Sequence, residues 1–428
     1  MLDKMQTENS SCVPHGARVL VTGGAGFIGS HTVDLLLDRG YQVRILDNLQ
    51  SRVHPRGKPE WVPKEAEFIH GDVTSHTDLS HALDSMDAVF HLAAFQDYLP
   101  EFSRFLHTNA ESAALLFELI VSDRKRFPVK KIVFASSQSV CGEGRYICTG
   151  GADLDETPFA SQVIRVASER TVITGSRGAA HGVMSPSSRP LEQLRRGHWE
   201  IRCPVCGRDM EPLRIDENTA NPHTAYGISK YAIEQLAGCL GRRYAIPSAC
   251  MRYTYVQGPR NSFFNAYSGV ARRFAMRILS GLPPVAYEDG KQLRDYVNVR
   301  DVARANVLAM ESENANFGVF NVGGGRAVTV LEFARIMLKA AGSSMEPLVP
   351  GEFRLGDTRH TVSDISRMQS LGWEPLIPVE QNVGEYLEWL RTQSVTTEYV
   401  LEADRVMRES GVVQQAASAS LQASRHYS

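Results

Sequence analysis

Short apolar runs alternate with longer amphipathic segments from residue 17 to about residue 142. The amphipathic segments end near Arg39, Leu83 and Arg126, and their apolar residues recur at helical spacing. This alternation predicts an α/β fold with a doubly wound parallel sheet and right-handed crossover connections. The runs expected to form its strands are residues 18–23, 42–47, 67–73, 87–94 and 130–142.

The alternation stops at residue 143, where a polar segment rich in glycine and serine begins, and it resumes near residue 216. An amphipathic helix follows from about His223 to Tyr244, and helices interleaved with short strands continue to about Leu390. The expected organisation is a flexible leader at 1–16, an α/β domain at 17–250 interrupted by a Cys-bearing insertion at 143–216, a stretch at 251–395 that is mainly a smaller C-terminal α/β substrate lobe, and a partly disordered tail at 396–428.

The first strand runs directly into three closely spaced glycines, Gly23, Gly26 and Gly29. Glycines at this spacing let the backbone turn tightly and approach a pyrophosphate at a helix N-terminus. Phe27 and Ile28 begin the apolar face of the helix that follows. The pattern predicts that the 17–250 domain is a Rossmann domain.

An acidic residue ends the second strand at Asp47, 18 residues beyond Gly29. A carboxylate at this position accepts hydrogen bonds from both hydroxyls of the adenosine ribose, and it repels a 2′-phosphate. The expected cofactor is therefore NAD rather than NADP.

Two further strand ends carry residues that suit a dinucleotide. Asp72 can receive the exocyclic amine of adenine while Val73 packs against the ring, although Asp72 could instead cap the following helix, as could Thr74 or Ser75. The fourth strand ends in small residues at 92–94, which leave room for a cofactor beside the backbone.

A tyrosine and a lysine, Tyr226 and Lys230, lie four residues apart on the 223–244 helix and therefore on one helix face. A lysine ammonium beside a phenol favours the phenolate, which is what a general base for an alcohol needs. The fifth strand ends in two hydroxyl residues, Ser136 and Ser137. Together with the glycine motif, these residues favour a catalytic interpretation over a solvated surface pair.

Composition narrows the classes of function. The chain has 428 residues, with 46 Lys plus Arg against 48 Asp plus Glu, so no net field favours nucleic acid or an anionic membrane. The polar N-terminus lacks the apolar core of a signal peptide, and no apolar run approaches a membrane span. We expect a cytoplasmic protein, in which seven cysteines form no disulfide scaffold.

The sequence resembles the extended short-chain dehydrogenase/reductase family, in its branch of NAD-dependent nucleotide-sugar epimerases and dehydratases. The resemblance covers about residues 17–395 except the insertion. The motifs that carry it are TGGAGFIGS, LDN, GDV, HLAA, ASSQSVCG, YGISK, GPR, RDYVNVRD, FNVGGG and DISRMQSLGW.

The resemblance implies roles for individual residues. Ser137 would hydrogen-bond the reacting sugar oxygen, Tyr226 would take its proton, and Lys230 would also hold the nicotinamide ribose. NAD would be held by Gly23, Gly26, Phe27, Ile28, Gly29, Asp47, Asn48, Asp72, Val73, Leu92, Ala93, Ala94, Asn109, Tyr226, Lys230 and Tyr253.

The resemblance also implies a substrate site. Arg294 and Arg354 match arginines that bind the substrate diphosphate, a contact that suits a planar guanidinium, although Arg294 could instead pair with Asp295 or Glu288. The residues expected to contact substrate are Gln96, Gln138, Ser139, Tyr255, Arg294 and Arg354.

Two positions after Ser137 favour epimerisation. Family dehydratases carry an Asp-Glu pair there as acid and base, whereas this chain has Gln138 and Ser139. What remains is hydride chemistry: Tyr226 removes the C4 hydroxyl proton, C4 gives hydride to NAD, the 4-keto sugar rotates, and hydride returns to the opposite face. The resemblance therefore implies a nucleotide-sugar 4-epimerase.

The sugar pocket departs from that of the usual UDP-galactose enzymes, with Tyr255 in place of an Asn, Gln257 in place of a Tyr, and Thr361 at a bulky gate position. Residues 95–98 and the Cys-bearing insertion resemble those of dTDP-L-rhamnose 4-epimerase-type proteins. This resemblance makes a dTDP-6-deoxyhexose such as dTDP-L-rhamnose the leading hypothesis for the substrate. The alternatives are a UDP-hexose 4-epimerase (glucose/galactose or glucuronate), an oxidoreductase with net redox change, and a non-catalytic dinucleotide sensor.

The insertion contains a candidate structural zinc site. Cys203 and Cys206 have the form of a zinc knuckle, and Cys148 and His181 could complete a Cys3His set, with His198 as the rival fourth ligand. The alternative is a reduced surface Cys-x-x-Cys pair.

The resemblance also implies a homodimer in which helices 106–126 and 226–244 of two copies form a four-helix bundle. The candidate apolar contacts are Ala113, Leu116, Ile233 and Leu240.

Overall fold

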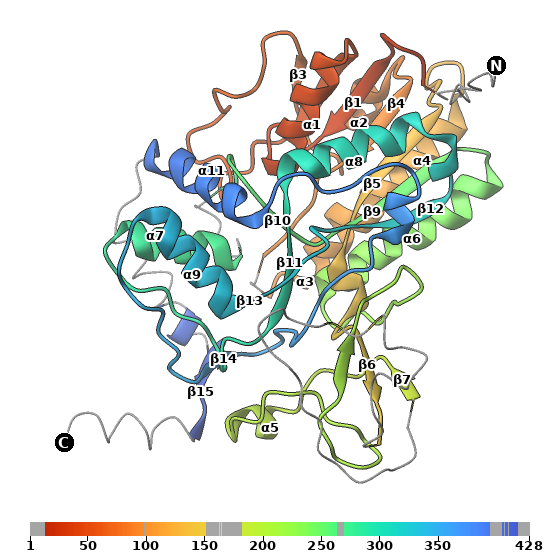
Figure 1. The fold of residues 1–428 in the computed structure, drawn as a ribbon. Coiled ribbons are helices and arrows are strands. Elements are labelled where there is room, and N and C mark those ends of the chain that lie inside the picture. The colour runs from red at the N-terminus through yellow and green to blue at the C-terminus, as the bar shows by residue number, and fades with distance from the viewer. Residues whose placement is uncertain are drawn as a thin grey trace, which may run out of the picture.

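Seven parallel strands form the central sheet of the computed structural model, in the order β12-β9-β5-β4-β1-β2-β3 (Figure 1). The structure describes residues 13–97, 100–150, 162, 164, 182–262, 269–393, 405, 407–409 and 411–417. The strands are β1 (Arg18–Thr22), β2 (Gln42–Asp47), β3 (Glu67–His70), β4 (Ala88–His91), β5 (Lys131–Ser137), β9 (Ser248–Tyr253) and β12 (Gly318–Val322). The predicted Rossmann architecture is confirmed.

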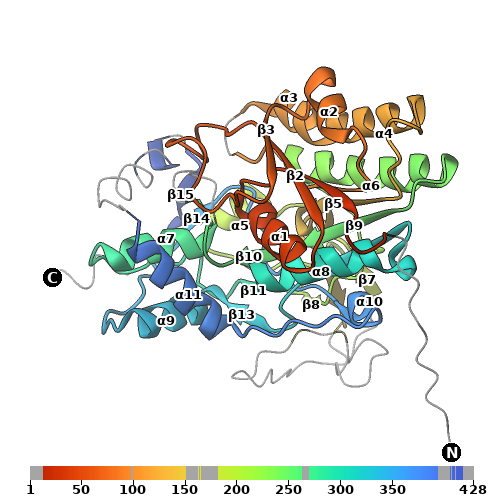
Figure 2. The same ribbon diagram turned by 90° about the horizontal axis from the view of Figure 1, so that it is seen from above.

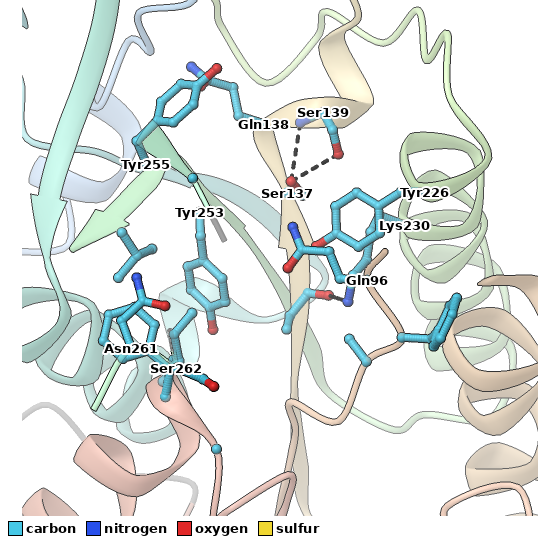
Figure 3. Close-up of a pocket in the computed structure, with 18 of the residues that line it drawn as sticks. Gln96, Ser137, Gln138, Ser139, Tyr226, Lys230, Tyr253, Tyr255, Asn261 and Ser262 are labelled. Atoms are coloured by element: carbon cyan, nitrogen blue, oxygen red, sulfur yellow. Dashed lines mark hydrogen bonds between the residues drawn. The ribbon is translucent and has the colours of Figure 1, made fainter. Parts of the chain in front are cut away.

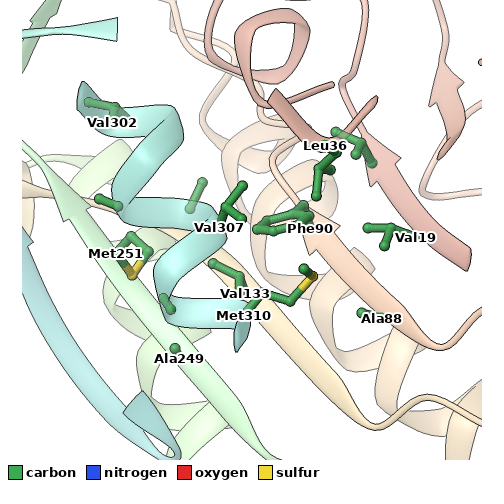
Figure 4. Close-up of a cluster of buried hydrophobic side chains, with 14 of the residues drawn as sticks. Val19, Leu36, Ala88, Phe90, Val133, Ala249, Met251, Val302, Val307 and Met310 are labelled. Carbon is green, nitrogen blue, oxygen red and sulfur yellow. The ribbon is translucent and has the colours of Figure 1, made fainter. Parts of the chain in front are cut away.

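Helices cover both faces of this sheet, as the view from above shows (Figure 2). One face carries α1 (Phe27–Asp38) and α8 (Val299–Glu311), and the other carries α2 (His76–Leu83), α4 (Ser112–Ser122) and α6 (Ala225–Arg243). Because side chains alternate along a strand, Val19 and Val21 of β1 join the core under α1 and α8, whereas Leu20 joins the opposite core. Figure 4 shows the first core, in which Leu36 and Val307 meet the sheet.

The strand order reverses between β1 and β4. The chain proceeds outward from β1 through β2 and β3, crosses to β4, and continues in the other direction through β5, β9 and β12. Crossovers that leave in opposite directions open a crevice at the carboxyl ends of the two strands, where α/β proteins bind ligands.

The helix predicted over 106–126 is instead composite. It comprises α3 (Phe102–Phe105), a π-helical segment at Leu106–Glu111, and α4, which ends at Ser122. π-helical turns are rare in proteins, and those that occur are often found at functional sites.

The C-terminal lobe contains the sheet β10-β11-β13, and its helices pack around a core of their own. The boundary expected at residue 250 does not divide the two lobes, because α8 and β12 lie beyond it and pack in the Rossmann half. The elements of the C-terminal lobe are β10 (Tyr255–Gln257), α7 (Val270–Leu279), β11 (Leu293–Asn298), β13 (Ala327–Thr329), α9 (Val330–Ala341), β14 (Glu352–Arg354) and α11 (Val379–Arg391). The short helix α10 (Ser366–Gln369) instead packs in the Rossmann half through Met368.

The insertion forms a three-stranded antiparallel sheet in the order β7-β6-β8, with the short helix α5. Its elements are β6 (Arg145–Cys148), β7 (Gly182–Met184), α5 (Leu191–Arg195) and β8 (Glu211–Leu213). Within the segment expected to be a tail, β15 (Val413–Gln415) pairs antiparallel with β14. Among the described helices, none combines the length and apolar character needed to cross a bilayer.

Candidate active site

A cavity of about 650 Å³ opens at the carboxyl ends of β1, β2, β4 and β5 and extends to the C-terminal lobe. One end is lined by the glycine turn and the other by residues of the lobe, such as Arg294 and Thr361. The close-up in Figure 3 shows its middle, where Ser137 on the strand faces Tyr226 and Lys230 on the helix.

The glycine turn is tightly packed. Gly23 has a φ of +70°, and a Cβ there would lie 2.8 Å from the Ala93 nitrogen. A Cβ on Gly29 would lie 2.1 Å from the Gly23 oxygen, a distance that no structure tolerates. No side chain caps the start of α1 at Gly26, so its first amides and positive dipole end are available to an anion. The turn therefore fits the pyrophosphate of NAD.

Asp47 is the last residue of β2, and it lines the cavity close to the glycine turn. Its Oδ2 accepts from the Ala25 amide at 3.0 Å and its Oδ1 from the Leu49 amide at 2.9 Å. These bonds fix the carboxylate beside the glycine turn, where a ribose would lie.

Asp72 also lines the cavity, and the alternative role of helix cap is wrong. Ser75 caps α2 by accepting from the Asp78 amide, whereas Asp72 accepts from Thr74 and, at 2.8 Å, from the Asn48 amide nitrogen. Burial opposes ionisation of Asp72, but the bonds from Thr74 and Asn48 outweigh it and lower its pKa. Asp72 is thus an anion that can accept from a base, and Val73 and Asn48 line the cavity next to it.

The sequence brings Ser137, Tyr226 and Lys230 together from two elements. Thr224 caps α6 by accepting from the Gly227 amide at 3.0 Å, which fixes where the helix begins. Lys230 Nζ donates to the Ala135 carbonyl of β5 at 2.8 Å and lies 5.7 Å from the centre of the Tyr226 ring.

Burial lowers the pKa of Lys230 to about 7, because its side chain has almost no contact with water. Near neutral pH the group is therefore close to its protonation midpoint. Any negative charge that develops beside it, such as a phenolate at Tyr226, would favour the ammonium form.

The Ser137 hydroxyl is hydrogen-bonded to Ser139. Its Oγ accepts from the Ser139 amide at 3.2 Å and is 2.9 Å from the Ser139 hydroxyl (Figure 3). Ser139 lies in the short 3-10 helix Gln138–Cys141 after β5. The arrangement can hold a sugar oxygen by hydrogen bonds, but Ser139 has no group that would act as a strong acid or base.

Asn109 is placed differently from the expectation that it contacts NAD. Its side chain is fully buried and is absent from the cavity wall. The amide oxygen accepts from the Phe95 nitrogen at 2.8 Å, and the amide nitrogen donates to the Phe95 carbonyl and to Ser229 Oγ. Asn109 therefore fixes the chain after β4 to helix α6, so that Ala93 and Ala94 border the cavity.

Tyr253 lines the cavity with its ring, because its hydroxyl is already engaged. The hydroxyl donates to Asn306 Oδ1 on α8 at 2.8 Å, and burial raises the pKa of the phenol. Leu92 borders the same space. Tyr253 can therefore contact a cofactor through its ring but not through its hydroxyl.

The substrate residues predicted near the sugar lie in one region. Gln96 is exposed to the cavity in front of Tyr226 (Figure 3). Gln138 Nε2 donates to Ser363 Oγ at 2.9 Å, and the Tyr255 hydroxyl accepts from Thr361 at 3.3 Å.

Arg294 is buried and fixed by backbone carbonyls. Its guanidinium donates to the carbonyls of Leu293, Thr358 and Arg359 at 2.8–2.9 Å and lies over the Tyr255 ring. The alternative ion pair with Asp295 or Glu288 is wrong, because those carboxylates bind other groups. Arg294 thus presents a fixed positive charge at the cavity wall.

Arg354 lines the cavity as well but forms an ion pair with Asp357, three residues later. A diphosphate would have to share or displace that carboxylate. The sequence did not identify another cation of the cavity, Arg273 of α7. Arg273 lines the cavity and donates to the Tyr287 hydroxyl at 2.6 Å. The adjacent Arg272 is buried, so the Arg-Arg pair alone could not identify which one faces the ligand.

A buried ion pair that the sequence did not reveal supports strand β5 from behind. Arg252 of β9 binds both oxygens of Glu234 of α6 at 2.7 Å, and Ser136 donates to the same carboxylate. Arg252 also donates to the Thr219 carbonyl at 2.9 Å. The pair ties β5, β9 and α6 together one residue below Ser137.

Three thiols converge in the insertion. The sulfurs of Cys148, Cys203 and Cys206 all lie within 4.8 Å of one another. His181 lies outside the described residues, but its neighbour Gly182 pairs directly with Cys148. His198, the rival ligand, does not belong to this cluster.

Comparison with known proteins places the fold and site in a family. A sequence profile of the NAD dependent epimerase/dehydratase family matches residues 19–164 and 203–323. The chain is 30% identical over 393 residues to the dTDP-L-rhamnose 4-epimerase of Burkholderia thailandensis, an alignment that covers 90% of this chain and 98% of that protein.

Two solved structures share the fold. The UDP-glucose 4-epimerase of Thermotoga maritima with UDP-glucose is 28% identical with a TM-score of 0.65, covering 88% of this chain and 99% of that one. The UDP-glucose 4-epimerase of Thermus thermophilus in complex with NAD is 27% identical with a TM-score of 0.61, covering 87% and 99%. The chain belongs to the NAD dependent epimerase/dehydratase family and is an NAD-dependent nucleotide-sugar epimerase.

Proposed function

We propose that this enzyme inverts C4 of a nucleotide-linked sugar and that its substrate is a dTDP-6-deoxyhexose such as dTDP-L-rhamnose. The observation that carries the reaction is the convergence of Ser137, Tyr226 and Lys230 on one cavity without an adjacent acid/base pair among the described residues.

Each of the three residues has a distinct part. Lys230 stabilises the phenolate form of Tyr226, this phenolate accepts the proton of the C4 hydroxyl to become a phenol, and Ser137 holds the same oxygen. The glycine turn and Asp47 would hold NAD, which would supply a reversible hydride acceptor for C4. Ser137 and Tyr226 release the 4-keto sugar long enough for it to rotate, and Tyr226 then returns the proton to the new C4 oxygen.

The carboxylates of the described cavity support epimerisation over elimination. Asp47 and Asp72 lie at the cofactor end. Glu143 accepts from the Arg359 amide at 2.9 Å, and Asp357 pairs with Arg354. Each of these carboxylates either lies at the cofactor end or is bound to another group. None of them is therefore placed to act as the acid or the base that a dehydration would need near Ser137.

Two sugar classes compete for the substrate site. The relative that is named a dTDP-L-rhamnose 4-epimerase favours a dTDP-6-deoxyhexose, whereas solved UDP-glucose 4-epimerases favour a UDP-hexose. Proton NMR of the enzyme with dTDP-L-rhamnose or UDP-glucose, with no NAD added, separates them. We expect the C4 epimer from dTDP-L-rhamnose alone; epimerisation of UDP-glucose alone would overturn the sugar assignment, and accumulation of reduced cofactor without epimer would indicate a net oxidoreductase.

The fixed carboxylate of Asp47 leads to a prediction about the cofactor. We expect the protein to bind NADP about 10²-fold or more weakly than NAD, since a 2′-phosphate beside a carboxylate is a like-charge contact that costs several kcal/mol. Titration of cofactor-depleted protein measures both affinities. Asp47→Asn should reduce the difference between the affinities for NAD and NADP. Equal binding of NAD and NADP by the unmodified protein would contradict the role of Asp47 as the ribose-binding carboxylate.

We also propose a structural zinc ion on Cys148, Cys203 and Cys206, with His181 as the fourth ligand. Three thiolates within 4.8 Å suit tetrahedral zinc, and a small sheet with little core of its own gains stability from a metal. Protein never exposed to chelator should contain one zinc per chain by mass spectrometry. Cys203→Ser should lose it and Cys239→Ser, an exposed cysteine elsewhere, should keep it; substoichiometric zinc in the unmodified protein would refute the site.

A homodimer is the proposed assembly, but through different side chains from those expected. Ala113, Leu116 and Ile233 lie in the core of the subunit itself, and Leu240 packs against that core. The exposed apolar side chains on α3, the π-helical segment, α4 and α6 are Phe102, Leu106, Val121 and Ile228.

Charge on this surface tests the dimer. Ile228→Asp should convert a dimer to a monomer in light scattering, because burying an unpaired carboxylate is costly. Leu376→Asp, at an exposed leucine in the C-terminal half, should leave the molecular mass of the dimer in solution unchanged. A monomeric unmodified protein would contradict the proposal.

A further inference from the structure

We propose that the insertion is a clamp that positions the wall of the nucleotide-sugar pocket formed by residues 354–361. The clamp consists of Arg189 and Glu200 of the insertion, Glu143 at its start, and Glu288 and Arg359 of the C-terminal lobe. Five residues of the wall, Arg354, Gly356, Asp357, Thr358 and Thr361, line the cavity.

Two arginines share one buried carboxylate at the centre of the clamp. Arg189 binds Glu288 through both oxygens at 2.9 Å, and Arg359 binds Glu288 Oε2 at 2.9 Å. All three side chains are buried, at 2% exposure or less. Such a cluster restrains its members, because displacing either arginine would take a buried charge away from its partner Glu288.

The clamp reaches the pocket wall through its backbone. Arg189 also donates to the Asp357 carbonyl at 2.8 Å, and Glu143 accepts from the Arg359 amide at 2.9 Å. The Thr358 and Arg359 carbonyls in turn accept from Arg294, the cation expected to face the diphosphate. The insertion thus fixes the same backbone that orients Arg294.

A second connection comes from the thiol-bearing part of the insertion. Tyr146 packs with Cys148 and Cys203 in one small core, and its hydroxyl accepts from the His360 amide at 3.1 Å. Glu200, next to this core, pairs with Arg359 and lies 3.0 Å from His360 Nε2. Residues 359 and 360 are therefore held by the insertion through backbone and side chains alike.

Apolar contacts fix the start of the wall. Leu194 of α5 packs with Phe353 of β14 and Ala416, next to β15, and Trp199 covers them. Strand β14 ends in Arg354, so insertion and C-terminal segment together hold the point where the wall begins (Figure 1).

The NAD half of the cavity is built independently. The Gly23 amide donates to the Leu46 carbonyl, and Asp47 accepts from the amides of Ala25 and Leu49, all within β1, β2 and their loops. Weakening the clamp should therefore impair binding of the sugar nucleotide and spare binding of NAD.

Substitution of Arg189 tests the proposal. In Arg189→Met we expect dTDP or UDP, whichever the unmodified enzyme binds, to bind about tenfold or more weakly by calorimetry, since misplacement by about 1 Å is enough to lose such contacts. The NAD content after purification should be unchanged. In turnover the KM for the sugar nucleotide should rise while kcat changes little, because Ser137, Tyr226 and Lys230 are untouched.

The matched control is Arg195→Met, which removes an exposed arginine of the same insertion whose partner, Glu192, is also exposed. It should bind as the unmodified enzyme does. If Arg189→Met does not fold, Glu200→Gln decides, because it removes only the partly exposed carboxylate that pairs with Arg359 and His360.

An unchanged nucleotide affinity in the folded variants, or an equal loss of NAD and nucleotide, would overturn the clamp. The inference rests on the proposed function only in that the ligand is a nucleotide-linked sugar. Failure of the unmodified enzyme to bind either nucleotide would overturn both, whereas intact binding by Arg189→Met would overturn the clamp alone.

Discussion

Tyr226→Phe should lower kcat by about 10²- to 10⁴-fold, the usual contribution of a general acid–base group. Among the described residues that line the cavity, Tyr226 is the only one with a lysine on the same helix face. Lys230 Nζ lies 5.7 Å from the centre of the Tyr226 ring. Removing the hydroxyl leaves Ser137 to hold the sugar oxygen but nothing to take its proton. The KM should change little, and the variant should retain its NAD.

Tyr231→Phe is the matched control for this experiment. Tyr231 lies on the same helix, five residues after Tyr226, and does not line the cavity. Steady-state kinetics of both variants, with cofactor content checked, separates loss of the base from disturbance of α6. Activity of Tyr226→Phe within about threefold of the unmodified enzyme would contradict its role, since that change is far below a general-base effect.

Arg252→Met should cost about 3–5 kcal/mol of the free energy of unfolding, the typical result of leaving one partner of a buried pair uncompensated. Glu234 would then retain Ser136 as its hydrogen-bond donor, and the Thr219 carbonyl would lose the guanidinium that donates to it. Equilibrium urea unfolding measures the loss. Because this pair lies beneath Ser137, activity should fall along with stability.

The double variant Arg252→Met, Glu234→Leu provides the control. With both charges removed, the unpaired carboxylate is gone, and replacing a buried pair by apolar side chains is often close to neutral. The double variant should therefore be more stable than Arg252→Met alone. A double variant that is equally or more destabilised would show that shape, rather than the unpaired charge, dominates at this position.

The sequence was informative where structure depends on near neighbours. Strand β1 and helix α1 follow from apolar spacing, and Gly23 and Gly29 follow from a turn in which a Cβ would collide with backbone. Tyr226 and Lys230 face one cavity because four residues separate them on a helix.

Features that depend on contacts distant in sequence could not be predicted. Arg189 and Glu288 lie 99 positions apart, and nothing in either local pattern marks them as partners. The π-helical turn that carries Asn109 has the same apolar spacing as an α-helix over so short a stretch. Strand β15 lies in polar, alanine-rich sequence and forms only because β14 offers it an edge.

Isotope transfer tests the central claim most directly, namely that C4 inverts through hydride chemistry alone. The enzyme would be incubated with dTDP-L-rhamnose in D₂O, or with a UDP-hexose if only that sugar reacts, and the C4 epimer analysed by proton NMR and mass spectrometry. We expect the epimer to retain its original hydrogens on C3, C4 and C5. Deuterium at any of these carbons would contradict it, because it would require a second acid/base that removes a carbon-bound proton.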